Sequence, residues 1–406
     1  MEIINKASLS KRVRIALCFI VMCIFIPSYN YYINEIVQID LGMPSLSPLF
    51  YFLLIIIGLY SFTYLPRVNS KLLLLIVAVL SGLLISYVLY PGIGRYILSQ
   101  DFNPLTSVLL FLSLMGFPLM IYTNYLSKHL YTLIDLARYP SLLLIVIAII
   151  DYYWTVLING NYFSVNYMSF SYYMLPAVCL SFIYGIRYRK ILDISIAAMG
   201  LIVILIVGSR GCFVCGLIFL VIISIKKYTQ SIGRFIIFLI ALLFVILVIF
   251  LVFDSFSENV STYMDNHGAT SRTLLLMEKG TVGESDTREA IYKWMLDAVE
   301  EQPWGFGLMG DRYIVSQHGT QGYAHSLFYE FLVDYGLFFG PLLLLLLSAK
   351  LFFKFKSDFQ KDDYYVLAAF LTLGYIKLFF SGSYLGEPFF WGLIGIVINN
   401  KNSNDF

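Results

Sequence analysis

The sequence predicts an all-α membrane protein that crosses the bilayer about twelve times, and its composition and its long apolar runs are the basis for this fold class. Of its 406 residues, 59% are hydrophobic and 13% are charged. A water-soluble domain carries about 25% charged residues to cover its surface. The mean hydropathy is +0.80. Runs such as 71–90 are close to the roughly 20 residues that a helix needs to cross a hydrocarbon core.

The first apolar run follows a basic lead (Lys6, Lys11, Arg12 and Arg14) and lacks a small-x-small cleavage site, so we expect an uncleaved first span. A membrane domain over 1–253 should hold nine spans, followed by an outer loop over 254–325 and a second membrane domain over 326–406 with three. The expected spans are 15–33, 49–65, 71–90, 105–122, 139–157, 172–186, 191–208, 212–225, 235–253, 327–349, 364–380 and 387–398.

The distribution of basic residues gives an orientation that is independent of hydropathy. With the N-terminus in the cytoplasm, most of the 27 Lys and Arg residues fall on the cytoplasmic side of this twelve-span arrangement. The long loop then lies outside and both termini lie inside. Ionisable residues within spans are few. Asp193 and Lys377 lie near predicted span ends, where we expect their side chains to reach toward the membrane interface.

The outer loop contains one clear helix signal. Asp286 and Glu289 form a capping-box-like start, and Pro303 follows the expected end of a helix near residue 301. Glycines at 305, 307 and 310 predict a tight turn beyond it. One face of the helix is apolar and should pack against the membrane domain; its residues are Ile291, Trp294, Met295 and Ala298.

Arginines are the first candidates for chemistry. Arg210 lies in a Gly-Ser-Arg-Gly turn between two predicted spans, where it either reaches the interface as a structural residue or binds an anion bidentately. Arg288 falls in the first turn of the predicted helix, where it either pairs with a neighbouring acid or takes part in the same site. Arg272 and Arg312 are weaker candidates, because acidic residues of the loop offer them ordinary surface partners.

His325 is the second kind of candidate, since it stands where the outer loop re-enters the membrane. A single histidine is more often structural, but a neutral ring at this position also suits a general base or a hydrogen-bond donor. His318 is a nearby alternative. Trp304 and Tyr323 are either interfacial aromatics or surfaces on which sugar rings stack. The outer loop shows no Asp-x-Asp motif or His/Cys cluster of the metal-ligand type.

The order of these motifs over about 208–340 resembles that of the O-antigen polymerase and O-antigen ligase superfamily, whose members are bacterial inner-membrane glycosyltransferases with a large periplasmic loop. Gly336 and Gly340 are spaced one residue wider than in the ligase pattern, which favours the polymerase branch. The resemblance rests on Ser209-Arg210-Gly211, on Arg288 followed by Trp294 and Pro303-Trp304-Gly305-Phe306-Gly307, and on His325-Ser326 ahead of Gly336.

The resemblance implies a GT-C-like fold and a polymerase of lipopolysaccharide biosynthesis. Such an enzyme moves a growing glycan from undecaprenyl pyrophosphate to a sugar hydroxyl of another lipid-linked repeat unit, without a cofactor or metal. Arg210 and Arg288 would hold the pyrophosphate and His325 would activate the hydroxyl. The other expected substrate contacts are Arg272, Arg312, His318, Tyr323 and Trp304.

The implied partners are undecaprenyl-pyrophosphate-linked oligosaccharides and a membrane protein that regulates chain length, and nucleic acid is not among them. Three alternatives remain open. The nearest is an O-antigen ligase, which moves finished polymer onto a lipid A core. A flippase or other transporter of lipid-linked sugars is disfavoured by the few charges within spans and the absence of a matching pair of broken spans. The last alternative is a non-catalytic membrane scaffold.

Overall fold

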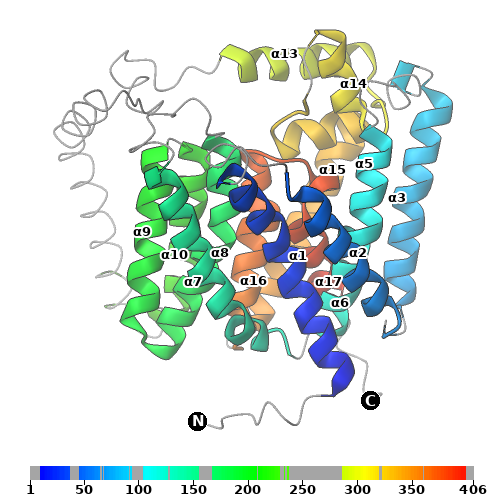
Figure 1. Ribbon diagram of the computed structural model, residues 1–406. Coiled ribbons are helices and arrows are strands. Elements are labelled where there is room, and N and C mark those ends of the chain that lie inside the picture. Colours follow the sequence, from blue (N-terminus) through cyan, green and yellow to red (C-terminus); the bar gives the residue numbers. More distant parts are fainter. Residues whose placement is uncertain are drawn as a thin grey trace. The chain divides into compact units, whose positions relative to one another are not determined.

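A computed structural model gives the structure of the protein (Figure 1). It describes residues 10–36, 45–64, 66, 68–90, 92–93, 104–126, 129–154, 167–207, 209–228, 233, 236, 286–319, 322–359 and 361–398. The predicted span 235–253, apart from residue 236, and the loop over 254–285 with Arg272 lie outside the described residues. The chain divides into two compact units, unit 1 (1–23, 54–130 and 285–406) and unit 2 (24–53 and 131–284).

The predicted all-α class is confirmed, since the described residues contain helices and no strand. Six of the described helices are long and apolar enough to cross a membrane. They cover Lys11–Asn34, Ser70–Leu89, Leu105–Tyr125, Thr132–Tyr152, Met168–Tyr188 and Leu327–Asp358. Four shorter apolar helices lie at other predicted spans, so the total of twelve stays a prediction. They cover Ser47–Phe62, Ile191–Val207, Tyr364–Phe379 and Pro388–Ile398.

Unit 1 holds the helices on which the candidate site is built. A π-helical turn at Leu112–Gly116 joins α5 to α6, and a second one at Thr372–Ile376 follows α16. The polar helices α13 and α14 lie at one end of the apolar helices of this unit (Figure 1). Its helices are α3 (Ser70–Leu89), α5 (Pro104–Phe111), α6 (Phe117–Tyr125), α13 (Asp286–Glu301), α14 (Gly310–Gln317), α15 (Leu327–Asp358), α16 (Tyr364–Leu371) and α17 (Pro388–Ile398), with parts of α1 (Lys11–Glu35) and α2 (Ser47–Phe62).

The core of unit 1 forms where α17 packs against α6. Thr123 donates to the carbonyl of Gly392 at 2.8 Å and Asn124 donates to that of Gly395 at 2.9 Å. A methyl group on Gly395 would overlap the backbone of Met120, so only glycine allows this approach. Trp391 of α17 is buried beside Phe117 and Phe390, and this apolar cluster extends to α3 and α15. Helices α6, α15 and α17 therefore share one core beneath α13 and α14.

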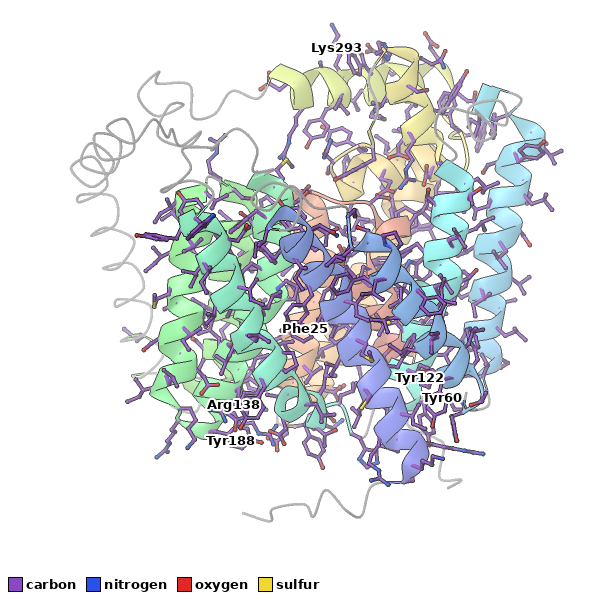
Figure 2. The ribbon with its side chains drawn as sticks, in the orientation of Figure 1. Phe25, Tyr60, Tyr122, Arg138, Tyr188 and Lys293 are labelled. Atoms are coloured by element: carbon purple, nitrogen blue, oxygen red, sulfur yellow. The ribbon has the colours of Figure 1, made fainter. Side chains whose placement is uncertain are left out.

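Unit 2 is a helical bundle of α7 (Thr132–Tyr152), α8 (Tyr167–Tyr188), α9 (Ile191–Val207) and α10 (Arg210–Tyr228), with α8 packed against the other three. Asp193 is fully buried and accepts two hydrogen bonds from Arg138, at 2.9 and 3.0 Å. At the same end of the bundle, Tyr188 donates to Asp135 at 2.7 Å (Figure 2). The expected reach of Asp193 to the interface is therefore wrong, because a guanidinium satisfies its charge inside the bundle.

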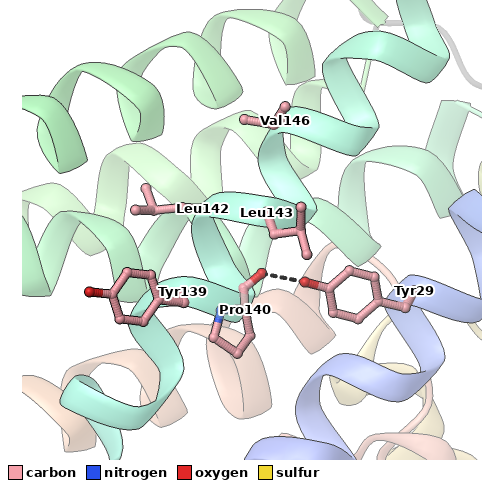
Figure 3. Close-up of a pocket in the computed structure, with 6 residues that line it drawn as sticks. All are labelled: Tyr29, Tyr139, Pro140, Leu142, Leu143 and Val146. Atoms are coloured by element: carbon pink, nitrogen blue, oxygen red, sulfur yellow. Dashed lines mark hydrogen bonds between the residues drawn. The ribbon is translucent and has the colours of Figure 1, made fainter.

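The same expectation is wrong for Lys377 in unit 1. Its ammonium forms an ion pair with Glu387, and both side chains are largely buried. In unit 2, an open apolar pocket lies between α7 and the part of α1 that carries Tyr29 (Figure 3). Tyr29 donates there to the carbonyl of Pro140 at 2.7 Å. The hydrogen bond thus satisfies the phenol beside an apolar surface.

Candidate functional site

The amphipathic helix α13 forms the outer layer of the candidate site. Ile291, Met295 and Val299 are buried against α14 and the first turns of α15, and Trp294 and Ala298 pack at the edge of this cluster. The predicted apolar face is confirmed, with Val299 as an additional member. The side chains of α13 therefore fix the polar first turn of the helix, which carries Arg288, relative to α15.

The glycine-rich turn after α13 inserts into a break in α15. Helix α15 is interrupted at Gly336, whose φ of 82° and ψ of 173° are not helical. The carbonyls of Val333 and Asp334 accept hydrogen bonds from the N–H groups of Phe306 and Gly307, at 2.8 and 3.0 Å. In return, the N–H of Leu337 donates to the carbonyl of Pro303 at 2.8 Å. The turn thus satisfies backbone groups that the break would otherwise leave unpaired.

Helix α3 holds the other side of this turn. Tyr90 at its end donates to the carbonyl of Gly305 at 3.0 Å, and the same carbonyl accepts from Gln302 at 2.6 Å. Leu308 is buried against the backbone of Gly82. The turn is therefore bonded on both sides, and it joins α3, α13 and α15 into one rigid support.

His325 stands at the start of α15 in an unusual backbone conformation. Its φ of 56° is in the left-handed region, which is unfavourable for a residue with a side chain. The ring is half-buried, Tyr323 lies against it at 4.2 Å between centroids, and Nδ1 has no hydrogen-bond partner among the described residues. A strained, partly buried imidazole with a free nitrogen is the pattern of a side chain prepared for a ligand.

Arg288 lies close enough to His325 to influence its protonation. Burial is the larger cause and the positive charge of Arg288 the smaller one, and together they lower the pKa of His325 from 6.5 to about 4. The imidazole is therefore neutral at pH 7. Within unit 1, the charge of Arg288 thus acts on a neutral His325 ring, and the catalytic roles of both residues stay predictions.

Two tyrosines set the spacing between α13 and α15 at this point. Tyr292 lies one turn after Arg288 in α13, and Tyr329 lies in the first turn of α15, four residues after His325. Their rings stack with centroids 4.2 Å apart and planes 11° from parallel. The stack therefore links the turn of α13 that follows Arg288 to the first turn of α15, which follows His325.

A buried polar cluster lies behind His325, and it contains Arg312. The guanidinium of Arg312 donates to Ser383 at 2.9 Å, and Ser383 in turn donates to Glu330. Asp334 accepts from Tyr384 at 2.8 Å. The expected exposed surface pairing of Arg312 is wrong, since its side chain is 12% exposed and its guanidinium donates to Ser383, far from the loop in sequence.

The remaining candidates occupy different surroundings. His318 is exposed, stacks on Trp294 with centroids 4.0 Å apart, and lies 3.1 Å from the carbonyl of Ile314 through Nδ1. Trp304 is 71% exposed and lies near Phe338, which is also exposed, so its indole faces outward from the site. Their roles in substrate binding, and that of Tyr323, stay predictions.

Arg210 begins α10 and belongs to unit 2, whereas Arg288 and His325 belong to unit 1. The predicted grip of both arginines on one pyrophosphate therefore stays a prediction. The first turn of α10 is fixed within its unit, because Phe213 donates to the carbonyl of Ser209 at 3.0 Å and Cys212 donates to that of Ser171 at 3.2 Å.

Sequence reasoning missed the acidic members of the buried cluster. Asp311, Glu330 and Asp334 are each at most 3% exposed. In the part of the chain that the structure describes, no group of three or more His, Cys, Asp or Glu residues could hold a metal ion. The signal in the sequence was the spacing of Glu330 and Asp334, which places two carboxyl groups on one face of an otherwise apolar helix.

Residues 194–345 match a family model described as O-antigen ligase, which confirms the resemblance to the O-antigen polymerase and ligase superfamily. The matched segment includes α10, α13, α14 and the first part of α15, and thus Arg210, Arg288 and His325. No curated protein matches the sequence. The family implies a glycosyltransferase-like enzyme, and together with the apolar helices it indicates a multi-pass membrane protein related to O-antigen synthesis.

Proposed function

Starting from the match of residues 194–345 to the O-antigen ligase family, we propose that the protein is an O-antigen polymerase. It transfers a growing glycan from undecaprenyl pyrophosphate to a sugar hydroxyl of another lipid-linked repeat unit. The enzyme works in the bacterial inner membrane with both termini in the cytoplasm and the site on the periplasmic side. A membrane protein that regulates chain length is a further partner.

The reaction forms one bond and breaks another at the same carbon. The acceptor hydroxyl oxygen attacks the anomeric carbon of the donor glycan, and the bond from that carbon to the diphosphate oxygen breaks. The hydroxyl proton passes through His325 to the departing diphosphate or to water. Because the pKa of His325 is about 4, the imidazole orients the hydroxyl while neutral and holds the proton only briefly.

The leaving diphosphate gains negative charge in the transition state, and guanidinium groups stabilise that charge without a metal ion. Arg288 supplies this charge beside His325, and Arg210 supplies a second positive charge. The observation that supports the proposal most directly is the pairing of Arg288 with a neutral, partly unsatisfied His325 in one support of α13 and α15. That pairing matches the two tasks of the reaction, anion stabilisation and hydroxyl activation.

Alanine substitutions test the assignment. In a strain that lacks the chromosomal copy, Arg210→Ala, Arg288→Ala and His325→Ala should each abolish long-chain polymer, measured as the ladder of chain lengths on a gel. Lys293→Ala is a matched control, since Lys293 is exposed on the same helix as Arg288 (Figure 2). Normal ladders from the Arg288 and His325 variants would remove both residues from the mechanism.

A lysine at position 210 separates charge from geometry. Arg210→Lys keeps the positive charge and loses the planar fork that binds two phosphate oxygens at once. If Arg210 binds the diphosphate, we expect shorter chains from the lysine variant and none from the alanine variant. Equal, full-length ladders from both variants would show that Arg210 has only a structural role.

An O-antigen ligase is the second candidate, because the description of the matching family model names that activity. A deletion strain distinguishes the two. Loss of a polymerase leaves single repeat units attached to the lipid A core, whereas loss of a ligase leaves none attached. We expect single units, and a core without any repeat unit would establish the ligase instead.

A further inference from the structure

Asp311 is connected to His325 through a single backbone group. Its Oδ2 accepts a hydrogen bond from the N–H of Ala324 at 3.0 Å, and Ala324 immediately precedes His325. Both Asp311 and Ala324 are 0% exposed. Hydrogen bonds between a buried carboxylate and a backbone N–H are stronger than those between neutral groups. The bond therefore fixes the backbone at Ala324, the residue immediately before His325.

The carboxylate of Asp311 is itself held from one side only. Its Oδ1 has no hydrogen-bond partner among the residues that the structure describes, and the guanidinium of Arg312 lies 4.0 Å from it. Burying such a carboxylate is costly, and a packed apolar residue would stabilise the fold at least as well. The presence of a carboxylate here thus points to the task of its other oxygen, which is to hold Ala324.

Helix α14 is in turn fixed to the rest of the site. Arg312, the residue after Asp311 in α14, donates to Ser383, and Ser383 donates to Glu330 in the first turn of α15. Ile314 and Val315 of the same helix pack against α13 and α15. A rigid helix therefore presents Asp311, and a carboxylate on a rigid support restricts the backbone that it bonds.

We propose that Asp311 is a positioning residue that holds His325 in its left-handed backbone conformation and thereby directs the imidazole toward the acceptor hydroxyl. A residue at φ 56° relaxes toward the usual negative values unless its neighbours are restrained. The bond to Ala324 is that restraint on the N-terminal side, and the first turn of α15 is the restraint on the other. The role in directing the hydroxyl rests on the proposed function.

Three variants of the full-length protein test the inference. Asp311→Ala removes the acceptor, and Asp311→Asn keeps an oxygen that accepts the same N–H while removing the charge. Asp297→Ala is a matched control, because Asp297 is an exposed acid on α13. If Asp311→Ala does not fold, Asp311→Glu replaces it, since the longer side chain keeps the charge and shifts the accepting oxygen by one methylene.

The first measurement is the rate at which diethyl pyrocarbonate modifies His325, followed by mass spectrometry of the purified protein. Losing a charged hydrogen bond should raise this rate about tenfold in Asp311→Ala, because the ring then samples positions that expose it. The rate in Asp311→Asn and Asp297→Ala should stay at the wild-type value. Exposed His318 provides an internal reference that should not change in any variant.

The second measurement is polymer length, which should collapse in Asp311→Ala and recover in Asp311→Asn. An unchanged modification rate of His325 in Asp311→Ala, or equal loss in the Ala and Asn variants, would overturn the inference. The two proposals fail in different ways. If the wild-type protein makes no polymer but the modification rate still rises in Asp311→Ala, the proposed function is rejected and the positioning role stands, whereas a normal ladder with an unchanged rate in Asp311→Ala rejects only the role of Asp311.

Discussion

Gly305 and Gly336 contact each other across the break in α15, and neither position has room for a side chain. A Cβ on Gly305 would lie 2.5 Å from the backbone nitrogen of Gly336, and a Cβ on Gly336 would lie 2.5 Å from the carbonyl oxygen of Pro303. Both residues also have positive φ, of 84° and 82°. This contact joins the glycine-rich turn to the helix that begins after His325, so the shape of the site depends on it.

Gly336→Ala should destabilise the protein strongly. The φ and ψ of this residue belong to a region that only glycine populates readily, and the new methyl group overlaps backbone atoms that cannot move aside. We expect a cost of about 3 kcal/mol, measured as a loss of thermal stability in detergent. Gly319→Ala is the matched control, since Gly319 also has positive φ but has open space around it. Its cost should be about 1 kcal/mol. Equal melting temperatures would contradict this account.

The stability of the region around His325 should fall on acidification between pH 6.5 and about 4. The folded-state pKa of His325 is about 4, below the usual value of 6.5, so the unfolded chain binds a proton that the folded chain does not. The contribution of the neutral imidazole to the free energy of unfolding is complete above pH 6.5 and is lost as the pH falls toward 4. The loss in the free energy of unfolding is on the order of 3 kcal/mol. Thermal unfolding across this range should show a smaller loss in His325→Gln. An identical pH dependence in both proteins would argue against the buried neutral ring.

The stack of Tyr292 on Tyr329 should matter through its rings and not through its hydroxyl groups. Tyr292→Phe keeps the stacked geometry, whereas Tyr292→Ala frees the first turn of α13. In the alanine variant Arg288 moves away, which removes the smaller of the two causes that lower the pKa of His325, so this pKa should rise above about 4. The pH dependence of diethyl pyrocarbonate modification measures this shift, with Leu296→Ala, an exposed position on the same helix, as the control. A Phe variant that behaved like the Ala variant would contradict the stacking role.

Breaking the ion pair of unit 2 should be costly, because Asp193 is fully buried. Arg138→Ala leaves its carboxylate without the guanidinium that donates two hydrogen bonds, and we expect a loss of about 3 kcal/mol in thermal unfolding. The guanidinium also lies 4.4 Å from the ring centroid of Tyr184, a contact that Arg138→Ala removes as well. Arg189→Ala, at an exposed position, serves as the control. Similar melting temperatures for the two variants would show that the pair contributes little.

The sequence predicted what depends on local pattern. Long apolar runs located the described apolar helices, and the helical spacing of apolar residues in 286–301 located the buried face of α13. The glycines at 305 and 307 located a turn with positive φ, whereas the short polar helix α14 was not predicted. Contacts between distant segments could not be predicted in this way. Asp193 was expected at the interface because its partner, Arg138, is 55 positions away along the chain and could not be recognised as a neighbour from the sequence.

The candidate site shows the same limit. Arg288 was predicted from its place in the first turn of a loop helix and His325 from its place where the loop re-enters the membrane, and both lie in unit 1, where the charge of Arg288 acts on His325. The carboxylate of Asp311 was missed, since an acid beside an arginine in a polar loop has the composition of an ordinary surface, and that of Glu330 was missed although it lies in an apolar helix. Only the packing of α14 against α15 buries them and makes their hydrogen bonds specific.

The break in α15 has a consequence for how the protein is made. Within a lipid environment, the N–H and carbonyl groups around residue 336 must be bonded at every stage, and a continuous helix is the state that bonds them before the glycine-rich turn arrives. We therefore expect the interruption of α15 to form together with the docking of the glycine-rich turn that bonds it.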